Sequence, residues 1–383
     1  MIFYTLLEII IPILALSWFL ILLFRIFSFF NIDKLSLDEN PLHNPLISII
    51  IPARNEKLNI LRCLESIQKQ TYSNFEVIVV DDNSTDDTYH IANQFCQNDD
   101  RFSLLKLNND DKTWVGKNRA CHEGSQISNG SLLLFIDADT EHKTNSIKSS
   151  LSYMQNNNLD VFTMFPQLTC SDFWGNLILP ILISMINILY SPLLLNSKST
   201  SIAYLVGGFI LIKKQIYDDI GGHESVKSSF VEDKSLGERL KKSGYNLKLI
   251  RSGDSVKTYS NTGFTNNIDA IQRATSASFI ESHLFLGLIS IFLAFIGLVL
   301  PYFLIFFVTS LEILYSILIL LTITFMGMSY LIEFVDINHS KLYVLFQPIT
   351  NLIFFYCMIF SVFKIHSNSS FVWRERAYTK KQL

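Results

Sequence analysis

Two acidic motifs lie on different segments of this chain, and carboxylates of this kind hold metal ions or move protons. Asp137-Ala138-Asp139 follows the apolar run Ser131–Ile136, which we expect to form a buried strand. Ligands of open α/β sheets bind beyond the carboxyl ends of the strands, and strand alternation would place Asp137 and Asp139 on one side. Such a pair can hold a divalent cation, which screens a nucleotide diphosphate and stabilises it as a leaving group.

The second motif, Glu232-Asp233, precedes a helical stretch and supplies two more carboxylates. Taken with the first motif, it indicates transfer of a sugar from a nucleoside diphosphate. Other acidic residues have a simpler explanation by composition alone, because aspartate is common in turns and at helix N-termini. These residues are Asp81, Asp82, Asp86 and Asp87.

The segments before these motifs alternate between strand and helix patterns. Apolar runs at Leu46–Ile51 and Phe75–Val80 predict buried strands. Between them, apolar residues recur at helical spacing, and Ser84–Asp87 offers capping residues for a second helix. The alternation predicts a parallel α/β sheet with ligand loops at the carboxyl ends of its strands. Pro52–Glu56 and Asp81–Asn83 occupy two of these loops.

Hydrophobic residues make up 49% of the 383-residue chain, more than an ordinary soluble enzyme needs, and the excess lies near both ends. Ile2–Phe24 is long enough to cross a hydrocarbon layer of about 30 Å. No small-residue cleavage site follows it, so we expect an uncleaved anchor. Arg25 and Lys34 follow this span, and Glu8 is the only charge within it. The positive-inside rule therefore predicts that the next segment lies in the cytoplasm.

Three further apolar runs near the C-terminus predict membrane helices, because an open segment can satisfy its backbone in lipid only as a helix. They are Leu284–Val308, Leu311–Phe334 and Leu342–Phe363, and the first two are expected to form a hairpin. Four spans would leave both termini outside. The tail, however, carries basic residues that the charge rule keeps inside. They are Lys364, Arg374, Arg376, Lys380 and Lys381. A re-entrant or interfacial run among the three would remove this conflict.

Phe173–Leu195 is also apolar, but Pro180, Asn187 and Pro192 interrupt it. We expect this segment to lie on the membrane surface. A single crossing here would put Glu232-Asp233 on the opposite side from the first acidic motif, and one site could not then form from both.

Cysteine usage and net charge argue against other classes of site. The five cysteines, Cys63, Cys96, Cys121, Cys170 and Cys357, show no paired short spacing, so neither a zinc site nor a disulfide framework is indicated. The net charge of −3 gives no argument for a nucleic-acid partner.

Four motifs together carry a resemblance to a known family. Ile51–Glu56, Val80–Asp86, Asp137-Ala138-Asp139 and Glu232-Asp233 occur in the order seen in family-2 glycosyltransferases. Over Leu46–Ile250 the chain resembles their GT-A fold. Trp114-Val115-Gly116-Lys117 and the tail motif Trp373–Tyr378 are similar to membrane-bound members that glycosylate carotenoids or accompany hopanoid synthesis.

The resemblance implies an α/β, GT-A-type nucleotide-sugar-binding domain with N-terminal and C-terminal transmembrane helices. We expect an N-terminal transmembrane anchor at 1–30, a GT-A domain at 46–255 with an interfacial segment at 173–195, an interfacial connector at 256–283, C-terminal transmembrane helices at 284–364 and a basic tail at 365–383. The protein is then a multi-pass protein of the cell membrane with a cytoplasmic catalytic domain.

The resemblance also implies roles for individual residues. Donor-binding roles fall on Pro52, Ala53 and Glu56 for the nucleoside, Asp82 for the base or ribose, Lys117 for the diphosphate and Asp137 for the nucleotide sugar. Asp139 is expected to bind Mg²⁺ or Mn²⁺, which bridges the phosphates and offsets the charge that develops on the leaving group. Asp233, beside Glu232, is the expected general base, which removes the proton of an acceptor hydroxyl as that oxygen attacks the anomeric carbon in line and inverts its configuration.

Some of these residues have structural alternatives. Taken alone, Lys117 is typical of a solvated surface lysine, and Trp114 of a core or interfacial anchor. His223, which follows the turn Gly221-Gly222, is more typical of a structural histidine and is left out of the catalytic set.

The expected reaction is transfer of one sugar from a nucleotide sugar, by resemblance a uridine diphosphate sugar, to a lipid acceptor such as a carotenoid or other isoprenoid. Processive polysaccharide synthases carry a Gln-x-x-Arg-Trp motif, and this chain has Gln272-Arg273-Ala274-Thr275-Ser276 instead. Two alternatives stay open. One is a polyprenyl-phosphate glycosyltransferase, and the other is an inactive membrane scaffold or nucleotide-sugar-binding subunit.

Overall fold

The computed structural model describes residues 2–37, 40–108, 111, 113–229, 231–260, 262–279, 283–367, 371–373 and 376–378. The chain divides into two compact units. The helical unit comprises Met1–Asn31, Cys170–Ser191 and Asn261–Ser369. The sheet unit comprises Ile32–Thr169, Pro192–Ser260 and Ser370–Leu383. Arg374, Lys380 and Lys381 of the predicted basic tail lie outside the described residues.

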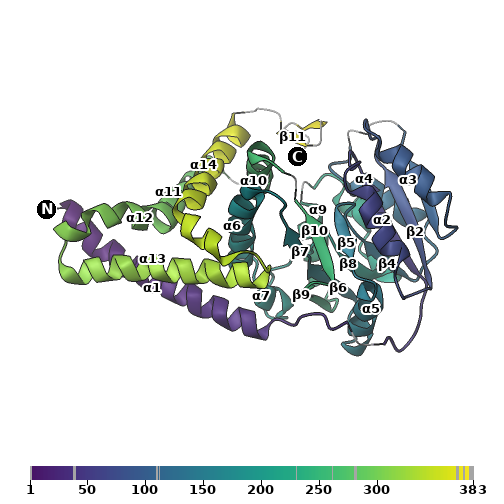
Figure 1. The fold of residues 1–383 in the computed structure, drawn as a ribbon, viewed down its shortest axis with the longest axis horizontal. Helices are drawn as coiled ribbons and strands as arrows, with labels where there is room; N and C mark the ends of the chain where they lie inside the picture. Colours follow the sequence, from purple (N-terminus) through teal and green to yellow (C-terminus); the bar gives the residue numbers. More distant parts are fainter. Residues whose placement is uncertain are drawn as a thin grey trace. The chain divides into compact units, whose positions relative to one another are not determined.

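A seven-stranded sheet with the order β3-β2-β1-β4-β8-β6-β9 is the centre of the sheet unit (Figure 1). Its strands are β1 (Ile47–Ala53), β2 (Phe75–Asp81), β3 (Phe102–Lys106), β4 (Leu132–Phe135), β6 (Val161–Phe165), β8 (Ile210–Lys213) and β9 (Leu247–Arg251). The predicted parallel pairing is present from β3 to β4 and between β6 and β9. β8 runs antiparallel to β4 and β6, because the chain reaches it from the edge where β4 ends and Ile210 pairs with Phe135. The sheet is therefore mixed, which corrects the prediction of a fully parallel sheet.

Helices cover both faces of this sheet, which explains why its central strands are apolar at most positions. The helices are α2 (Ile60–Gln68), α3 (Thr88–Cys96), α4 (Asn118–Gln126), α5 (Ser146–Asn156), α7 (Pro192–Asn196), α8 (Lys214–Asp219) and α9 (Glu232–Lys242). Ile49 and Ile51 pack in the core that contains α2, α3 and α5. Ile50 points to the opposite face and packs in the core that contains α4, α8 and α9. In α2, Ile60, Leu64 and their neighbours at helical spacing form the buried side of the helix.

Two smaller sheets complete this unit. β5 (Thr140–His142), β10 (Val256–Tyr259) and β7 (Gln167–Thr169) pair in the order β5-β10-β7. β11 (Phe371–Trp373) and β12 (Arg376–Tyr378) form an antiparallel hairpin, in which Trp373 pairs with Arg376. The first sheet begins directly after Asp139, and the hairpin contains four described residues of the predicted tail motif that ends at Tyr378.

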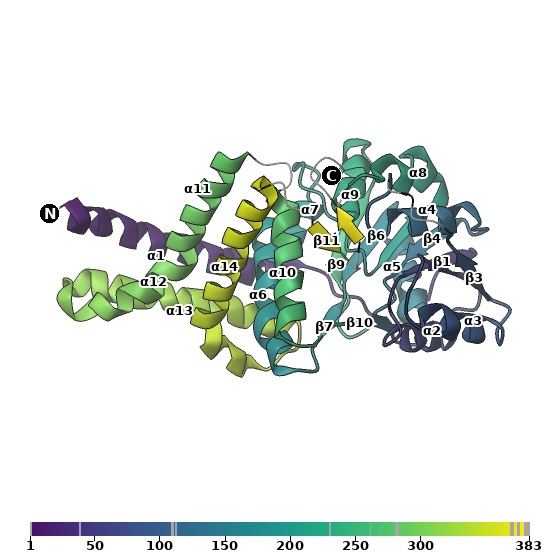
Figure 2. The same cartoon turned by 90° about the horizontal axis from the view of Figure 1, so that it is seen from above.

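The helical unit is built from one N-terminal helix and several helices near the C-terminus (Figures 1 and 2). Its elements are α1 (Ile2–Asn31), α6 (Phe173–Leu189), α10 (Phe264–Phe279), α11 (Leu284–Ala294), the π-helical turn η2 (Phe295–Val299), α12 (Leu300–Leu304), η3 (Ile305–Ser310), α13 (Ile313–Asp336), η4 (Lys341–Phe346) and α14 (Gln347–His366). Among the described residues, five helical stretches are long and apolar enough to cross a membrane. They are Thr5–Asn31, Phe173–Asn196, Leu284–Ser310, Ile313–Asp336 and Lys341–His366.

Candidate active site

The carboxyl ends of β1 and β2 lead into two loops that hydrogen bonds hold together. Ala53 pairs with Asp81 at the last position of these strands, and the Asp82 amide donates to the Ala53 carbonyl at 2.8 Å. Arg54 Nη1 donates to the Asp82 carbonyl at 2.7 Å. Asn55 has a φ of 53°, and its side-chain oxygen accepts a hydrogen bond from the amide of Thr85. Asparagine tolerates this left-handed backbone better than most residues, so the loop keeps its shape without glycine.

Pro52, Ala53, Glu56 and Asp82 therefore lie close together at one edge of the sheet. Glu56 and Asp82 are buried, at 6% and 4% exposure. The amide of Glu56 donates to Thr88 Oγ1 at 2.7 Å, and the Glu56 carboxylate accepts from Asn59 at 2.9 Å. In contrast, Asp86 Oδ1 accepts hydrogen bonds from the amide and hydroxyl of Thr88. Asp86 thus has the turn role that its residue type favours.

Asp137 and Asp139 belong to a turn between two short strands. β4 ends at Phe135, one residue earlier than the expected strand, and the amide and hydroxyl of Thr140 both donate to the Asp137 carbonyl, at 3.2 and 2.7 Å. The Asp139 carbonyl accepts a hydrogen bond from the amide of Tyr259 in β10. The positions of the two carboxylates therefore follow from this turn and from β10, and strand alternation does not apply to them.

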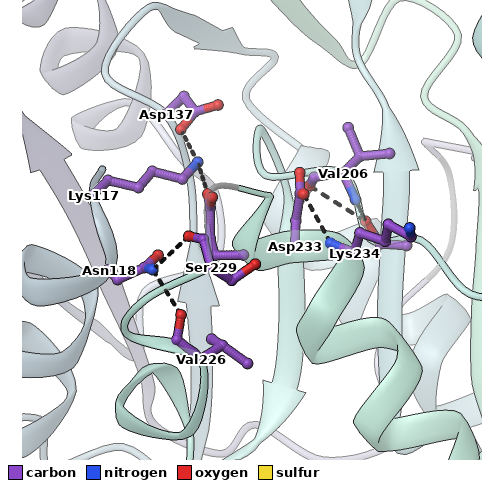
Figure 3. Close-up of polar contacts among 10 residues, drawn as sticks. Lys117, Asn118, Asp137, Val206, Val226, Ser229, Asp233 and Lys234 are labelled. Carbon is purple, nitrogen blue, oxygen red and sulfur yellow. Dashed lines mark hydrogen bonds and ion pairs between the residues drawn. The ribbon is translucent and has the colours of Figure 1, made fainter. Parts of the chain in front are cut away.

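Lys117 lies at the centre of a cluster of acidic side chains. Its ammonium group donates to Asp137 Oδ1 at 2.6 Å, and a carboxylate oxygen of Glu232 lies 3.5 Å away (Figure 3). The Lys117 side chain is 21% exposed. Burial lowers the pKa of Lys117, but the charges of Asp137 and Glu232 raise it by more, so the pKa is well above its usual value. Lys117 is charged at neutral pH and links the two acidic motifs of the sequence.

Asp233 is the second residue of α9, and its carboxyl group is in a partly buried and acidic environment. Its Oδ1 accepts a hydrogen bond from the amide of Lys234 at 2.8 Å (Figure 3). Burial and, to a smaller extent, the charge of the neighbouring Glu232 raise the pKa of Asp233 to about 7, while Lys117 acts in the opposite direction. A carboxyl group with a pKa near the working pH suits general base catalysis, because it both accepts and releases a proton readily.

Asn118 positions the segment before α9, a role that no motif or spacing in the sequence indicates. This residue is fully buried, and its side-chain amide donates to the carbonyls of Val226, Lys227 and Ser229 at 3.0, 3.3 and 3.2 Å. Figure 3 shows Asn118 pointing toward Val226 and Ser229 while the neighbouring Lys117 points toward Asp137. The start of α4 thus positions both Lys117 and the segment from Val226 to Ser229, which leads to Glu232-Asp233.

His223 is buried in a structural position. Its ring nitrogen Nδ1 lies 2.9 Å from the Tyr217 hydroxyl, and its ring packs on Phe135. Burial lowers the pKa of His223 to about 3, so the ring is neutral at physiological pH. Trp114 stacks on His122, with ring centroids 5.1 Å apart. Trp114 therefore makes an aromatic contact with α4, the helix that starts directly after Lys117.

Gly207 leaves the room that Lys117 occupies, and this leads to a first prediction. A Cβ atom at position 207 would lie 2.5 Å from Lys117 Nζ and 3.5 Å from Asp233 Oδ2. Gly207→Ala should therefore push the flexible end of Lys117 away from Asp137. A charge-assisted hydrogen bond is worth about 1.5–3 kcal/mol, so we expect donor affinity or turnover to fall by about 10–100-fold. The midpoint of thermal unfolding should change little, because only the end of one side chain must move.

Gly297→Ala is the matched control for this prediction, since a Cβ atom there meets no atom within 4 Å. This variant should resemble the wild type both in nucleotide-sugar binding, measured by calorimetry, and in thermal unfolding. Wild-type binding and turnover by Gly207→Ala would show that the contact between Gly207 and Lys117 has no functional importance.

The donor atoms at this edge suit a hard divalent cation. Carboxylate oxygens such as those of Asp137 and Asp139 are preferred ligands of Mg²⁺ and Mn²⁺. Among the residues that the structure describes, no group of three or more histidine, cysteine, aspartate or glutamate side chains is arranged to hold a metal ion. A cation here would therefore take most of its remaining ligands from phosphate oxygens and water, as Mg²⁺ commonly does.

Comparisons with known proteins show which family this chain resembles. A family model described as "Glycosyl transferase family 2" matches residues 48–221. Glycosyltransferase GlyG of Streptococcus pneumoniae is 34% identical over 116 residues, which are 30% of this chain and 37% of that protein. The 4,4'-diaponeurosporenoate glycosyltransferase of Staphylococcus haemolyticus is 28% identical over 199 residues, 51% of this chain and 52% of that protein. The aligned part thus spans about half the length of these relatives or less.

A solved structure also resembles this chain. It is the mannosyltransferase PcManGT from Pyrobaculum calidifontis in complex with GDP-Man and Mn²⁺. The sequence identity is 17%, the TM-score is 0.52, and the similarity covers 71% of this chain and 73% of that chain. At this identity the likeness concerns the fold, which is of the GT-A type.

Proposed function

Since residues 48–221 match the model of glycosyltransferase family 2 and the fold resembles the GT-A type, we propose that the chain is a membrane-bound, inverting glycosyltransferase that transfers a single sugar to a lipid. The observation that carries this proposal is the cluster around Lys117, which joins Asp137, Glu232 and Asp233 at the edge where the ligand loops of the sheet meet. Sugar transfer from a nucleoside diphosphate needs a positive charge near the phosphates and a base near the acceptor. The Lys117 ammonium group and Asp233, whose pKa lies near neutral pH, can supply these two functions.

The proposed donor site uses the loops after β1, β2 and β4. Pro52, Ala53 and Glu56 contact the nucleoside, and Asp82 contacts the base or ribose. The sugar lies against Asp137, and Lys117 meets the diphosphate. Support for this arrangement comes from the hydrogen bonds between the first two loops and from the burial of Glu56 and Asp82.

The reaction we propose is one in-line displacement. Asp233 removes the proton from an acceptor hydroxyl as that oxygen attacks the anomeric carbon, and the bond from this carbon to the diphosphate oxygen breaks. The diphosphate leaves with the electron pair, and the anomeric configuration is inverted. Lys117 offsets the negative charge on the leaving group. A Mg²⁺ or Mn²⁺ ion held by Asp139 would supply further charge neutralisation at the phosphates when bound.

A lipid acceptor is supported by the five apolar helices and by one of the relatives. An enzyme for soluble acceptors has little use for several membrane helices. The relative from Staphylococcus haemolyticus is named for a carotenoid-type acceptor, 4,4'-diaponeurosporenoate. We therefore propose a carotenoid-type or other isoprenoid lipid with a free hydroxyl group. For the donor we propose a uridine diphosphate sugar, with the guanosine diphosphate sugar of PcManGT as the comparison to test.

We also place the sheet unit in the cytoplasm, where nucleotide sugars are made. The charge asymmetry around the first span supports this placement, because Arg25 and Lys34 follow the apolar run and Glu8 precedes its centre.

The direct test is transfer by the purified protein in detergent. We expect a mass increment of one sugar on a single lipid class when total membrane lipid, Mg²⁺ or Mn²⁺ and either a uridine or a guanosine diphosphate sugar are supplied. Mass spectrometry of the lipids identifies the acceptor and the sugar type together. Nucleotide-sugar binding without transfer to any lipid, and without hydrolysis, would indicate a binding subunit and contradict the proposal.

The elevated pKa of Asp233 gives a pH prediction. We expect kcat/KM to rise with pH through an apparent pKa near 7, because Asp233 must be ionised to act as base. Lys117→Met removes a charge that lowers the pKa of Asp233, so the rise should move to higher pH in the residual activity. Lys143→Met, which breaks an exposed pair with Asp254, should leave the profile in place.

Unfolding provides an independent check on this pKa. Asp233 binds its proton more tightly in the folded protein than in the unfolded chain, where its pKa is close to 3.8. Its contribution to the free energy of unfolding therefore falls as pH rises from about 4 to about 7. Asp233→Asn should remove this part of the pH dependence. An identical pH dependence in the variant would contradict the assigned pKa.

A further inference from the structure

Two long helices of the helical unit share one direction and three others cross it, while α11 runs obliquely to the first two in Figure 2. In both views α1 and α13 run beside each other, whereas α6, α10 and α14 cross their direction steeply (Figures 1 and 2). α14 packs along α10 and also contacts α6, α11 and η2. A helix that crosses a membrane next to others is expected to run near their direction, with the modest tilt typical of membrane helices. The direction of α14 therefore differs from that of a span beside α13.

Two apolar clusters lie at different positions along α1 and α13, one near the starts of these helices and one nearer their ends. The Ile11 cluster contains Leu7 and Ile11 of α1, Leu304 of α12 and Ile319 of α13. Among the described residues, no side chain of α6, α10 or α14 belongs to it. The Tyr330 cluster contains side chains from α1, α6, α10, η2, α13 and α14. The half of the unit near the starts of α1 and α13 thus has a core made by α1, the run from Leu300 to Leu311, and α13.

Polar contacts mark the other end of α1 and α13. Arg25 of α1 and Glu333 of α13 form a buried ion pair at 2.5 Å, and the Asn187 amide of α6 lies 3.1 Å from both Glu333 oxygens. Arg25 lies six residues before the end of α1, and Glu333 lies three residues before the end of α13. Buried charged groups in membrane proteins pair with one another, and they cost less free energy near the interface than at the centre of the bilayer. The contact fixes α6 at this end of both helices.

Chain connectivity supports the same placement of α6. The segment before it ends in β7, and the segment after it begins with α7, where Asn196 exchanges two hydrogen bonds of 2.8 Å with the backbone of Leu249 in β9. Both β7 and α7 belong to the sheet unit. A single crossing by α6 would require that one folded unit lies on both sides of the membrane. α6 therefore enters and leaves on the same side.

The surface of α14 has a stripe of exposed apolar side chains on one side of the helix. The stripe consists of Ile349, Leu352, Tyr356, Phe360 and Phe363, spaced by three or four residues. The opposite side carries buried polar groups, including Asn351, which accepts from Tyr330 at 3.0 Å, and Ser361, which lies 2.7 Å from Thr275 Oγ1 of α10. The stripe is therefore the side of α14 that can contact acyl chains, and the polar side is the one that packs on α10 and α13.

From these observations we infer that the chain crosses the membrane three times, by α1, by the run from α11 to η3 and by α13. α6, α10 and α14 lie within a single leaflet, and the stripe on α14 contacts the acyl chains of that leaflet. With three crossings, the C-terminal tail is on the same side as the sheet unit. Lys364 and the basic tail then obey the positive-inside rule, and the hairpin β11–β12 can belong to the sheet unit, with which it groups.

Epitope tags in sealed vesicles test the number of crossings. One tag is placed after Leu383, one between Asn157 and Asn158 in the sheet unit, and one between Leu311 and Glu312 at the start of α13. We expect the tags after Leu383 and at Asn157 to be digested together, and the tag at Leu311 to be digested only from the other side. A C-terminal tag that shares the side of the Leu311 tag would overturn the inference. The test needs no enzyme activity, so its outcome is independent of the proposed reaction.

Depth measurements with spin labels test the position of α14. The background carries serine at Cys96 and Cys170, the two partly exposed cysteines. Labels at Ile349, Tyr356 and Phe363 follow the stripe, and labels at Leu314, Leu321 and Met328 follow α13 at the same seven-residue spacing. We expect similar depths for the α14 labels, within about one helical turn of 5 Å, and a maximum at Leu321 on α13. A depth maximum at Tyr356, with Ile349 and Phe363 near opposite surfaces, would overturn the inference.

Discussion

Asp233→Asn is expected to lower the rate of sugar transfer by about 10²–10⁴-fold, the usual contribution of a general base, while nucleotide-sugar binding changes little. The amide has the shape of the carboxyl group but cannot accept the proton of an acceptor hydroxyl. It also removes a carboxyl group whose ionisation burial disfavours, so the variant should be at least as stable as the wild type above pH 7. Calorimetry with the donor and a product assay should therefore give different results for this variant.

Two further variants give this experiment its controls. Glu238→Gln lies in the same helix, where its exposed side chain is 3.8 Å from Lys234, and it should transfer sugar at the wild-type rate. Glu232→Gln should cause a smaller loss than Asp233→Asn, because Glu232 is paired with Lys117. Near-normal transfer by Asp233→Asn would exclude Asp233 as base and favour a phosphate acceptor, which is already ionised. Loss of donor binding would instead assign Asp233 to the nucleotide-sugar pocket.

Asp139→Ala should lower metal-dependent turnover by about 10²–10³-fold, since a cation at the phosphates is worth several kcal/mol in the transition state. The side chain lies in a turn between β4 and β5, so the fold should be retained. Mn²⁺ binding in the presence of a nucleoside diphosphate, followed by electron paramagnetic resonance, should weaken in parallel. Asp254→Asn, which removes an exposed carboxylate paired with Lys143, is the control and should bind Mn²⁺ as the wild type does. Wild-type turnover by Asp139→Ala across a metal titration would contradict the assignment.

The parts of the fold that local sequence patterns specify were predictable. Ile47–Ile51 and Phe75–Val80 are largely apolar runs, and they form neighbouring strands of a sheet that is covered on both faces. The direction of β8 was not predictable, because Ile210–Ile212 is an apolar run without information about orientation. That direction depends on where the chain returns to the sheet after α6 and α7, which is a property of the whole topology.

In the candidate site, too, some features follow from local sequence patterns and others depend on contacts between distant segments. Motifs of several residues, such as those around Asp82 and Asp137, were recognisable, and the loops after β1 and β2 lie together as parallel strands require. The turn that holds Asp137 and Asp139 depends on hydrogen bonds from Thr140 and Tyr259, which follow no local pattern. Asn118 and Gly207 act through contacts with segments about 90–110 residues away, so a single sequence gives no signal for either.

The ion pairs of Lys117 affect how the affinity for any nucleotide should be interpreted. The ammonium group already has two carboxylates as partners in the structure, so a diphosphate that binds to it exchanges one set of partners for another. The measured free energy of binding then contains the difference between the interaction energies of Lys117 with the diphosphate and with the carboxylates. It therefore understates the strength of the contact between Lys117 and the diphosphate. A nucleoside monophosphate with no group at the position of the outer phosphate would leave these ion pairs intact, so it can bind nearly as tightly as the full donor. In that case the contact between Lys117 and the outer phosphate contributes little to binding of the donor. It strengthens when the leaving group acquires its additional negative charge, so it stabilises mainly the transition state and accelerates the reaction.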